Sequence, residues 1–147
     1  MKPIGYWLNR TDKALTRSMN GMLEEFGLTR IAWQVLNVIH GTPETADTEV
    51  LSSLAANADT ATLAEAIDTV LADGWAHRPA PGLLTLTPGG RRRLTDVAAR
   101  VDAFREVSMA GISLEEYHTA VRVLERMSNN LEKATGAGRS ALSVPSP

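Results

Sequence analysis

The segment TEVLSSLAANADTATLAEAIDTVLADG, residues 48–74, decides the fold. Thr48 to Ala56 is typical of a short helix, and Asn57-Ala58 makes a tight turn. The Asp59 side chain can cap a second helix, which Gly74 ends. Two helices with so short a turn between them predict a helix-turn-helix. The buried stripe of the second helix would be Leu63, Ala66, Ile67 and Val70.

The downstream residues predict a small β-hairpin and two further helices. Two short extended runs, 75–78 and 83–87, flank the turn cluster Pro79-Ala80-Pro81-Gly82. Thr87-Pro88 opens the next helix, because proline is tolerated at a first helical position. Ser113 opens the last helix, and Glu116 completes a capping box.

The upstream residues predict two helices. The first spans about 4–26 and is followed by Gly27 as its C-cap, and Thr29 caps the second, which runs to about Ile39. The first and last helices are more apolar than a lone monomer needs, which indicates an intertwined homodimer. We therefore expect one domain over 1–135, with dimerisation helices at about 4–26 and 113–133, a winged helix-turn-helix at about 48–90 and a disordered tail at 136–147.

Composition bounds the class of protein. The chain has 147 residues, of which 44% are hydrophobic and 22% charged, as in one ordinary globular domain. It contains no cysteine, which rules out disulfides, a thiolate nucleophile and cysteine-bound metals. No apolar run approaches the roughly 18 residues of a membrane span, and the N-terminus lacks a signal-peptide pattern. We expect a cytoplasmic protein.

The charge is unevenly distributed. Fifteen Lys and Arg stand against 17 Asp and Glu, so the formal net charge is only -2. From Ile31 to His77, however, there is no Lys or Arg. This acidic segment holds Glu44, Asp47, Glu49, Asp59, Glu65, Asp68 and Asp73. It contains the predicted helix-turn-helix, so its sign bears directly on the partners of that element.

Four short motifs together resemble the MarR family of bacterial regulators. They are GLTRIAWQVL (27–36), LADGW (71–75), LTLTPGG (84–90) and MSNNL (127–131), and the resemblance covers about Ile4 to Leu131. It implies a mainly α fold with a small β-hairpin wing, that is, a winged helix-turn-helix with flanking dimerisation helices. It also implies a homodimer that binds double-stranded DNA, with a recognition helix in the major groove and a wing in the minor groove.

The same resemblance assigns the residues expected to face DNA. In the recognition helix Glu65 stands where the family very often has arginine, and a carboxylate accepts from cytosine N4 but repels phosphate. At the wing tip, Pro79-Ala80-Pro81-Gly82 replaces the usual charged residues. The three consecutive arginines after the wing could instead be a solvated surface run. The expected DNA-binding residues are Thr60, Thr62, Glu65, Arg78, Arg91, Arg92 and Arg93.

A ligand cleft is expected among the first, second and fifth helices, as in the family. Two of its side chains, Trp7 and Arg10, share one face of the first helix. Two indoles beside a guanidinium and an imidazole suit a flat, partly anionic aromatic ligand. Alternatively, Trp33 is a core residue and Arg10 a surface charge. The expected ligand-binding residues are Tyr6, Trp7, Arg10, Trp33, Asn37 and His40.

No catalytic motif is present in the sequence. There is no glycine-rich phosphate loop, no G-x-S-x-G and no HExxH, and the three histidines lack metal-ligand spacing. We expect no metal, cofactor or catalytic residue, although an acid–base role for His40 or Glu65 stays open. The sequence thus predicts a ligand-modulated transcriptional regulator. The alternatives are a MarR-like fold that has lost DNA binding and binds or transforms a small metabolite, and a protein-interaction role for the acidic face.

Overall fold

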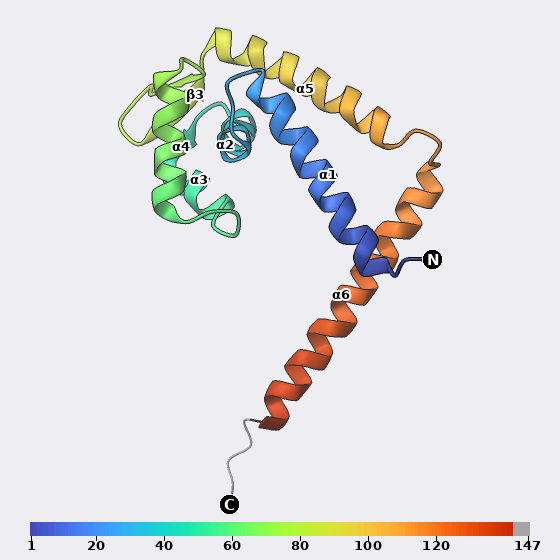
Figure 1. Cartoon of the computed structure of the whole chain (residues 1–147). Coiled ribbons are helices and arrows are strands. Elements are labelled where there is room, and N and C mark those ends of the chain that lie inside the picture. Colours follow the sequence, from blue (N-terminus) through green and yellow to red (C-terminus); the bar gives the residue numbers. More distant parts are fainter. Residues whose placement is uncertain (143–147) are drawn as a thin grey trace, which may run out of the picture. The chain divides into compact units, whose positions relative to one another are not determined.

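The computed structural model describes the backbone of residues 1–142 and the side chains of residues 1–136 (Figure 1). The chain divides into two compact units, Met1–Phe104 and Arg105–Pro147, whereas the sequence predicts one domain through residue 135. The helix α5 (Pro88–Ser108) crosses the boundary between the units. No helix of the described residues is long and apolar enough to cross a membrane.

The first unit contains the predicted helix-turn-helix and wing. Its elements are α1 (Ile4–Glu24), α2 (Arg30–His40), β1 (Thr45–Ala46), α3 (Asp47–Ser53), α4 (Thr60–Ala72), β2 (Ala76–His77), β3 (Leu83–Leu86) and the greater part of α5. The helix-turn-helix is α3–α4, and the hairpin β2–β3 is its wing. The predicted fold class, mainly α with a small β-hairpin wing, is confirmed.

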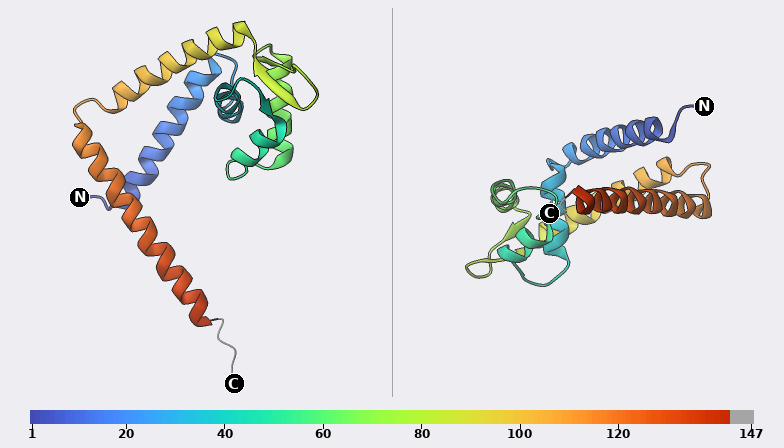
Figure 2. Two further views of the ribbon diagram at one scale, coloured as in Figure 1. Left: turned by 180° about the vertical axis from the view of Figure 1, so that it is seen from behind. Right: turned by 90° about the horizontal axis from the view of Figure 1, so that it is seen from below.

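The core of this unit is built around α2. In Figures 1 and 2 this helix lies among α3, α4 and β3, and it packs against all three. Its own buried residues are Ala32, Val35, Leu36 and Ile39. The α4 residues Leu63, Ala66, Ile67 and Val70 are buried as the sequence predicts. Trp75, only 1% exposed, is the largest of the fully buried side chains.

The sheet has one strand that the sequence analysis did not predict. Its order is β1-β3-β2 and both pairings are antiparallel, with Thr45 opposite Leu84 and Ala76 opposite Leu86. The strand β1 is only two residues long, so it carries no periodic pattern of its own. The buried Thr45 side chain shares a hydrogen bond with Thr42 at 2.6 Å.

Several helix caps and stop signals that the sequence predicts are present, although the short helix predicted at 48–56 spans Asp47–Ser53. Gly27 and Gly74 have positive φ angles of 69° and 78°, which turn the chain out of α1 and α4. The Thr29 hydroxyl accepts from the Ala32 amide at 3.2 Å and so caps α2. The capping box of the last helix is formed by Ser113 and Glu116, with two reciprocal hydrogen bonds of 3.0 Å.

Thr87 joins the end of α4 to the start of α5. Its hydroxyl donates to the Gly74 carbonyl at 2.7 Å and accepts from the Gly90 amide at 2.8 Å. Its own amide donates to the Trp75 carbonyl at 3.0 Å. At Gly90 the backbones approach so closely that a Cβ would lie 2.0 Å from the Trp75 oxygen. We call Gly74, Trp75, Thr87 and Gly90 the Thr87 junction.

The second unit holds the end of α5, a turn at Gly111 and α6 (Leu114–Leu142). The sequence predicts that this helix ends near 133 and that disorder begins at 136. The backbone instead stays helical to Leu142, because extending a formed helix costs far less than starting one. The rest of the predicted tail, 143–147, lies outside the described residues. Apolar side chains exposed along α6 are Leu114, Tyr117, Val121, Val123, Met127 and Leu131.

Replacing Gly90 by alanine tests the Thr87 junction. The Gly90→Ala methyl group meets backbone that cannot move without opening the junction, so we expect the free energy of unfolding to fall by about 2 kcal/mol. Gly89→Ala is the matched control, because the nearest atom to its Cβ is 3.9 Å away. Helix propensity should make that variant neutral or up to about 1 kcal/mol more stable. Urea unfolding curves measure the free energy of unfolding of both variants. Equal values for Gly90→Ala and Gly89→Ala would contradict the close backbone contact at the Thr87 junction.

Candidate nucleic-acid interface

The exposed face of α4 carries no positive charge. Its buried stripe points into the core, which leaves the opposite face to solvent, as in a recognition helix. Glu65 and Asp68 are exposed on the solvent side. Thr60, Thr62 and Thr69 are exposed there as well, and the Thr69 hydroxyl is bonded to the Glu65 carbonyl at 3.0 Å. This face therefore offers hydroxyls and carboxylates to a partner and no cation that would attract phosphate.

Asp59 holds the N-terminus of α4. Its carboxylate accepts from the Thr62 amide at 2.7 Å. Hydrogen bonds from the Thr62 side chain and backbone lower the pKa of Asp59, because both favour the charged carboxylate. Thr62 is thus partly engaged within the protein, as the partner of the cap.

Arg78 is paired with a carboxylate of the acidic segment. Its guanidinium donates to both oxygens of Asp47, at 2.8 and 3.0 Å, and to the Leu83 carbonyl at 3.5 Å. The hydrogen bonding to Asp47 is the main cause that raises the pKa of Arg78, and the charge of Asp68 adds to it. The charge that the sequence analysis assigned to DNA is therefore already balanced inside the protein.

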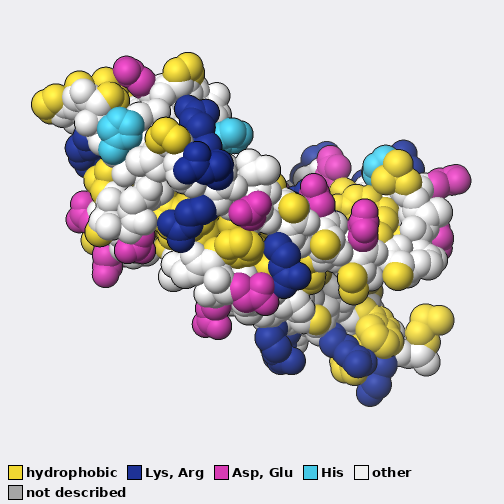
Figure 3. Space-filling view, turned by 90° about the horizontal axis from the view of Figure 1, so that it is seen from above, with side chains coloured by type: hydrophobic (Ala, Val, Ile, Leu, Met, Phe, Trp, Pro, Cys, Tyr) yellow, Lys and Arg dark blue, Asp and Glu magenta, His cyan; other side chains and the backbone are white. Residues whose placement is uncertain are grey.

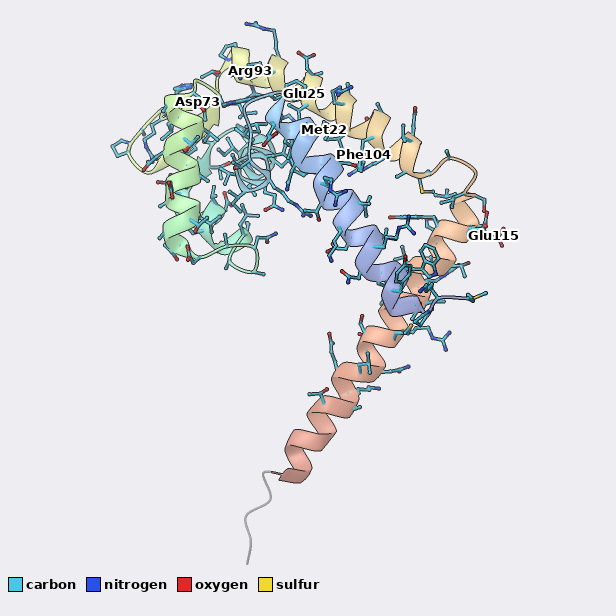
Figure 4. The ribbon with its side chains drawn as sticks, in the orientation of Figure 1. Met22, Glu25, Asp73, Arg93, Phe104 and Glu115 are labelled. Carbon is cyan, nitrogen blue, oxygen red and sulfur yellow. The ribbon has the colours of Figure 1, made fainter. Side chains whose placement is uncertain are left out.

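The three consecutive arginines have different surroundings. The Arg93 guanidinium lies 3.8 Å from the centre of the buried Trp75 ring, and it donates to the Asp73 carbonyl at 3.5 Å. Figure 4 labels Arg93 near the start of α5 and Asp73 near the end of α4, close to each other. Arg91 and Arg92 are exposed. Within the described part of the chain, neither side chain is in a hydrogen bond, an ion pair or a cation–π contact.

The surface shows the same distribution of charge. In Figure 3 the dark blue Lys and Arg side chains form small separate groups with acidic side chains among them. On the face drawn in this figure, positive charge is thus divided among a few discrete groups rather than spread as a continuous basic surface.

The predicted ligand residues form two separate groups. Tyr6 and Trp7 are in edge contact, with ring centres 5.1 Å apart. Arg10 lies 5.6 Å from the Trp7 ring and donates to the Tyr6 hydroxyl at 3.5 Å. Both rings are exposed, Tyr6 by 41% and Trp7 by 47%. These three predicted residues of α1 do come together.

The second group lies on α2. Trp33 is half-buried and packs against the core, while Asn37 and His40 are exposed. Among the described residues, no hydrogen bond, ion pair or ring contact joins this group to Tyr6, Trp7 or Arg10. Trp33 thus fits both predictions, a core residue and a ligand-binding residue, because one side of it packs against the core while the rest of the side chain is accessible to solvent.

An open cavity lies where α1 ends and α2 begins. Its volume is about 410 Å³, and it contains none of the predicted ligand residues. It offers one carboxylate and one guanidinium beside apolar side chains. The walls of this cavity come from a helix end and a turn, which carry no periodic pattern, so no signal in the sequence marks it. Its lining residues are Asn20, Glu24, Leu28, Thr29, Arg30 and Ile31.

No metal centre is evident in the described residues, where no group of three or more His, Asp or Glu side chains could hold an ion. His40, His77 and His118 are all exposed.

These elements define a winged helix-turn-helix protein, and comparison with solved structures gives the particular fold. A mutant of Escherichia coli MarR complexed with operator DNA matches with a TM-score of 0.69 and 20% identity, over 85% of this chain and 93% of that one. The Mycobacterium tuberculosis MarR family protein Rv2887, in complex with DNA, matches with a TM-score of 0.69 and 23% identity, over 86% and 98%.

A Listeria innocua protein of unknown function matches with a TM-score of 0.70 and 25% identity, over 86% of this chain and 91% of that one. No protein-family model and no curated protein sequence matches the chain. The resemblance to the MarR family that the four motifs indicate is thus confirmed at the level of the fold.

The pKa of Asp59 predicts how the α4 cap responds to acid. A lowered pKa in the folded state means that the cap stabilises the protein above the ordinary value of 3.8, and that this contribution is lost as pH falls through the lower folded value. Asp59→Asn keeps a capping oxygen but does not titrate in this range. We expect the Tm of the wild type to fall more steeply below about pH 4 than that of Asp59→Asn. If calorimetry gave the same dependence of Tm on pH for the wild type and Asp59→Asn, the contribution of the cap would be contradicted.

Proposed function

We propose that the protein is a homodimeric DNA-binding transcriptional regulator of the MarR type, whose DNA affinity a small molecule modulates. The observation that carries the proposal is the solvent-exposed face of α4, which lies beside the wing. The same fold occurs in two proteins whose structures were determined in complex with DNA. A cytoplasmic location belongs to the same proposal, because a regulator must reach the chromosome.

In this proposal α4 enters the major groove. Thr60 and Thr62 would contact phosphate or base edges there, and Glu65 would accept a hydrogen bond from cytosine N4. Arg91 and Arg92, the exposed arginines after the wing, would bind phosphates. Because so few cations are available, the proposed affinity depends more on base contacts than on phosphate attraction.

The homodimer is supported by the exposed apolar side chains of α1 and of α6. On α1 these include Ile4, Leu8 and Leu15, each more than 40% exposed. Surfaces of this kind are covered in stable proteins, and a second copy of the chain covers both helices symmetrically. Two recognition helices would then meet two half-sites of an operator.

Ligand control would work by a shift between two arrangements of the dimer. A ligand that fits better when the recognition helices are misspaced weakens DNA binding by that difference in affinity. The Tyr6, Trp7 and Arg10 cluster offers two exposed rings and a cation, and the accessible side of Trp33, with Asn37 and His40 on the same helix, offers a separate aromatic surface. A flat aromatic anion in contact with both groups would join α1 to α2.

A second candidate function is a MarR-like fold that no longer binds DNA and binds or transforms a small metabolite. The observation that favours it is the charge of α4, where Glu65 and Asp68 face outward while Arg78 is neutralised by Asp47. The two exposed carboxylates repel phosphate, and the pairing with Asp47 weakens the attraction of Arg78 for it.

Mobility-shift titration with the DNA upstream of the protein's own coding region tests the first function. We expect the protein to shift this DNA at low salt, and we expect its affinity for the DNA to fall only a little as the salt concentration rises. Glu65→Arg should bind DNA of any sequence more tightly, and the slope of log affinity against log salt should steepen by about 2, since each subunit of the proposed homodimer gains one phosphate contact.

Glu106→Arg is the matched control for this charge change. Glu106 is exposed on the last turn of α5, outside the first unit, and an arginine there is favourable at a helix C-terminus. An equal effect of both variants would assign the gain to net charge alone. Absence of a shift at micromolar wild-type protein, with DNA bound by neither variant, would favour the second function.

Calorimetric titration with benzoate, a flat aromatic anion, tests the ligand residues. Trp33→Ala and Arg10→Gln should each weaken binding at least roughly fivefold, because one removes ring contact and the other removes the cation. Lys13→Gln is the control, since it removes an exposed charge from the same helix. Unchanged binding by Trp33→Ala would contradict this pocket, and loss of binding by Arg30→Gln alone would move the site to the cavity between α1 and α2.

A further inference from the structure

The sheet of the wing is held by few backbone hydrogen bonds. Its edge strands β1 and β2 are two residues long, and each pairs with the central strand β3 over two residue positions. One further backbone bond connects the wing to α3, from the Asp47 amide to the Gly82 carbonyl at 3.1 Å. So short a sheet depends on side chains to fix its strands relative to the helix-turn-helix.

Arg78 spans this sheet from one edge to the other. It follows β2 directly, its guanidinium bonds the Leu83 carbonyl of the central strand, and it ends on the Asp47 carboxylate immediately after β1. The pair is bidentate, which fixes direction as well as distance. Both side chains are about one-third exposed, 35% for Arg78 and 32% for Asp47, so solvent screens the pair only in part.

The turn that forms the wing tip starts at the next residue after Arg78. Pro79 and Pro81 restrict the backbone of that turn, and Leu83 closes it with a hydrogen bond from its amide to the Ala80 carbonyl at 3.1 Å. Because the two prolines restrict the turn and the Arg78–Asp47 pair restrains the residue before it, the orientation of the turn relative to the sheet is restricted. Arg78 therefore lies where the wing tip leaves the sheet, beside the Asp47–Gly82 backbone bond that also connects the wing to α3.

We propose that Arg78 is a positioning residue for DNA recognition, which sets the wing against the helix-turn-helix through Asp47 and does not itself bind phosphate. This rests on the proposed DNA-binding function. It replaces the direct DNA contact that the sequence analysis expected of Arg78 with an indirect role through the Arg78–Asp47 pair.

Three variants separate positioning from direct contact. Arg78→Ala and Asp47→Ala should each weaken binding to the upstream DNA roughly two- to fivefold, as expected for a partly exposed ion pair, and the double variant should be no weaker than either one. Arg78→Lys keeps the positive charge but cannot donate two parallel hydrogen bonds to the Asp47 carboxylate, so it should weaken DNA binding as much as Arg78→Ala does. The salt slope should stay that of the wild type in all of them.

Arg100→Ala is the matched control. Arg100 also forms an ion pair within the first unit, in which one guanidinium nitrogen donates to both oxygens of Glu25 at 2.8 and 3.1 Å, and it joins α5 to the end of α1 rather than to the wing. This variant loses an arginine and its ion pair away from the wing and should leave DNA binding unchanged.

Amide hydrogen exchange gives a readout that needs no DNA. The protection factors of the amides at residues 47 and 83 should fall roughly two- to fivefold in Arg78→Ala, Arg78→Lys and Asp47→Ala, and not in Arg100→Ala. If the wild type binds no DNA, the proposed function fails while these exchange rates still decide whether Arg78 positions the wing.

Two results would overturn the inference. One is tighter DNA binding with a steeper salt slope in Asp47→Ala, which would make Arg78 a phosphate ligand that Asp47 restrains. The other is wild-type protection at residues 47 and 83 in Arg78→Ala, which would show that the wing keeps its place without the pair.

Discussion

The Thr87 hydroxyl bonds to the ends of two helices at once, the Gly74 carbonyl after α4 and the Gly90 amide in α5. The helix α4, the wing and α5 all meet at this point. Because Gly90 has no side chain, the first turn of α5 rests directly on the Trp75 carbonyl, and Arg93 then covers the Trp75 ring. The direction of α5 thus depends on a backbone contact that a side chain at residue 90 would prevent.

Two of the arginines predicted to face DNA are used inside the protein. Arg78 and Arg93 each bind groups of the acidic segment, the first a carboxylate and the second a carbonyl and an indole. The acids that stay exposed on α4 lie on the side that a partner would meet. If the proposed function holds, specific readout of bases and weak general attraction to DNA are two consequences of this one arrangement.

Local features of the sequence predicted most of the fold. The caps at Thr29, Asp59 and Ser113 need only a few neighbouring residues, so they can be found from spacing alone. The strand β1 could not be found, since a two-residue strand is defined by its partner. The three arginines look equivalent in sequence, yet only Arg93 meets Trp75, because the fold brings together residues that are distant in the chain.

The three tryptophans occupy three different environments, which makes the chain its own optical probe. Trp7 is 47% exposed on α1, Trp33 is half-buried on α2, and Trp75 is sealed beneath a guanidinium. Their emission maxima should be ordered from red to blue in that sequence, as indole emission follows the polarity around the ring. Only Trp75 lies where α4, the wing and α5 converge, so a shift in the bluest component reports a rearrangement at that convergence without any attached dye.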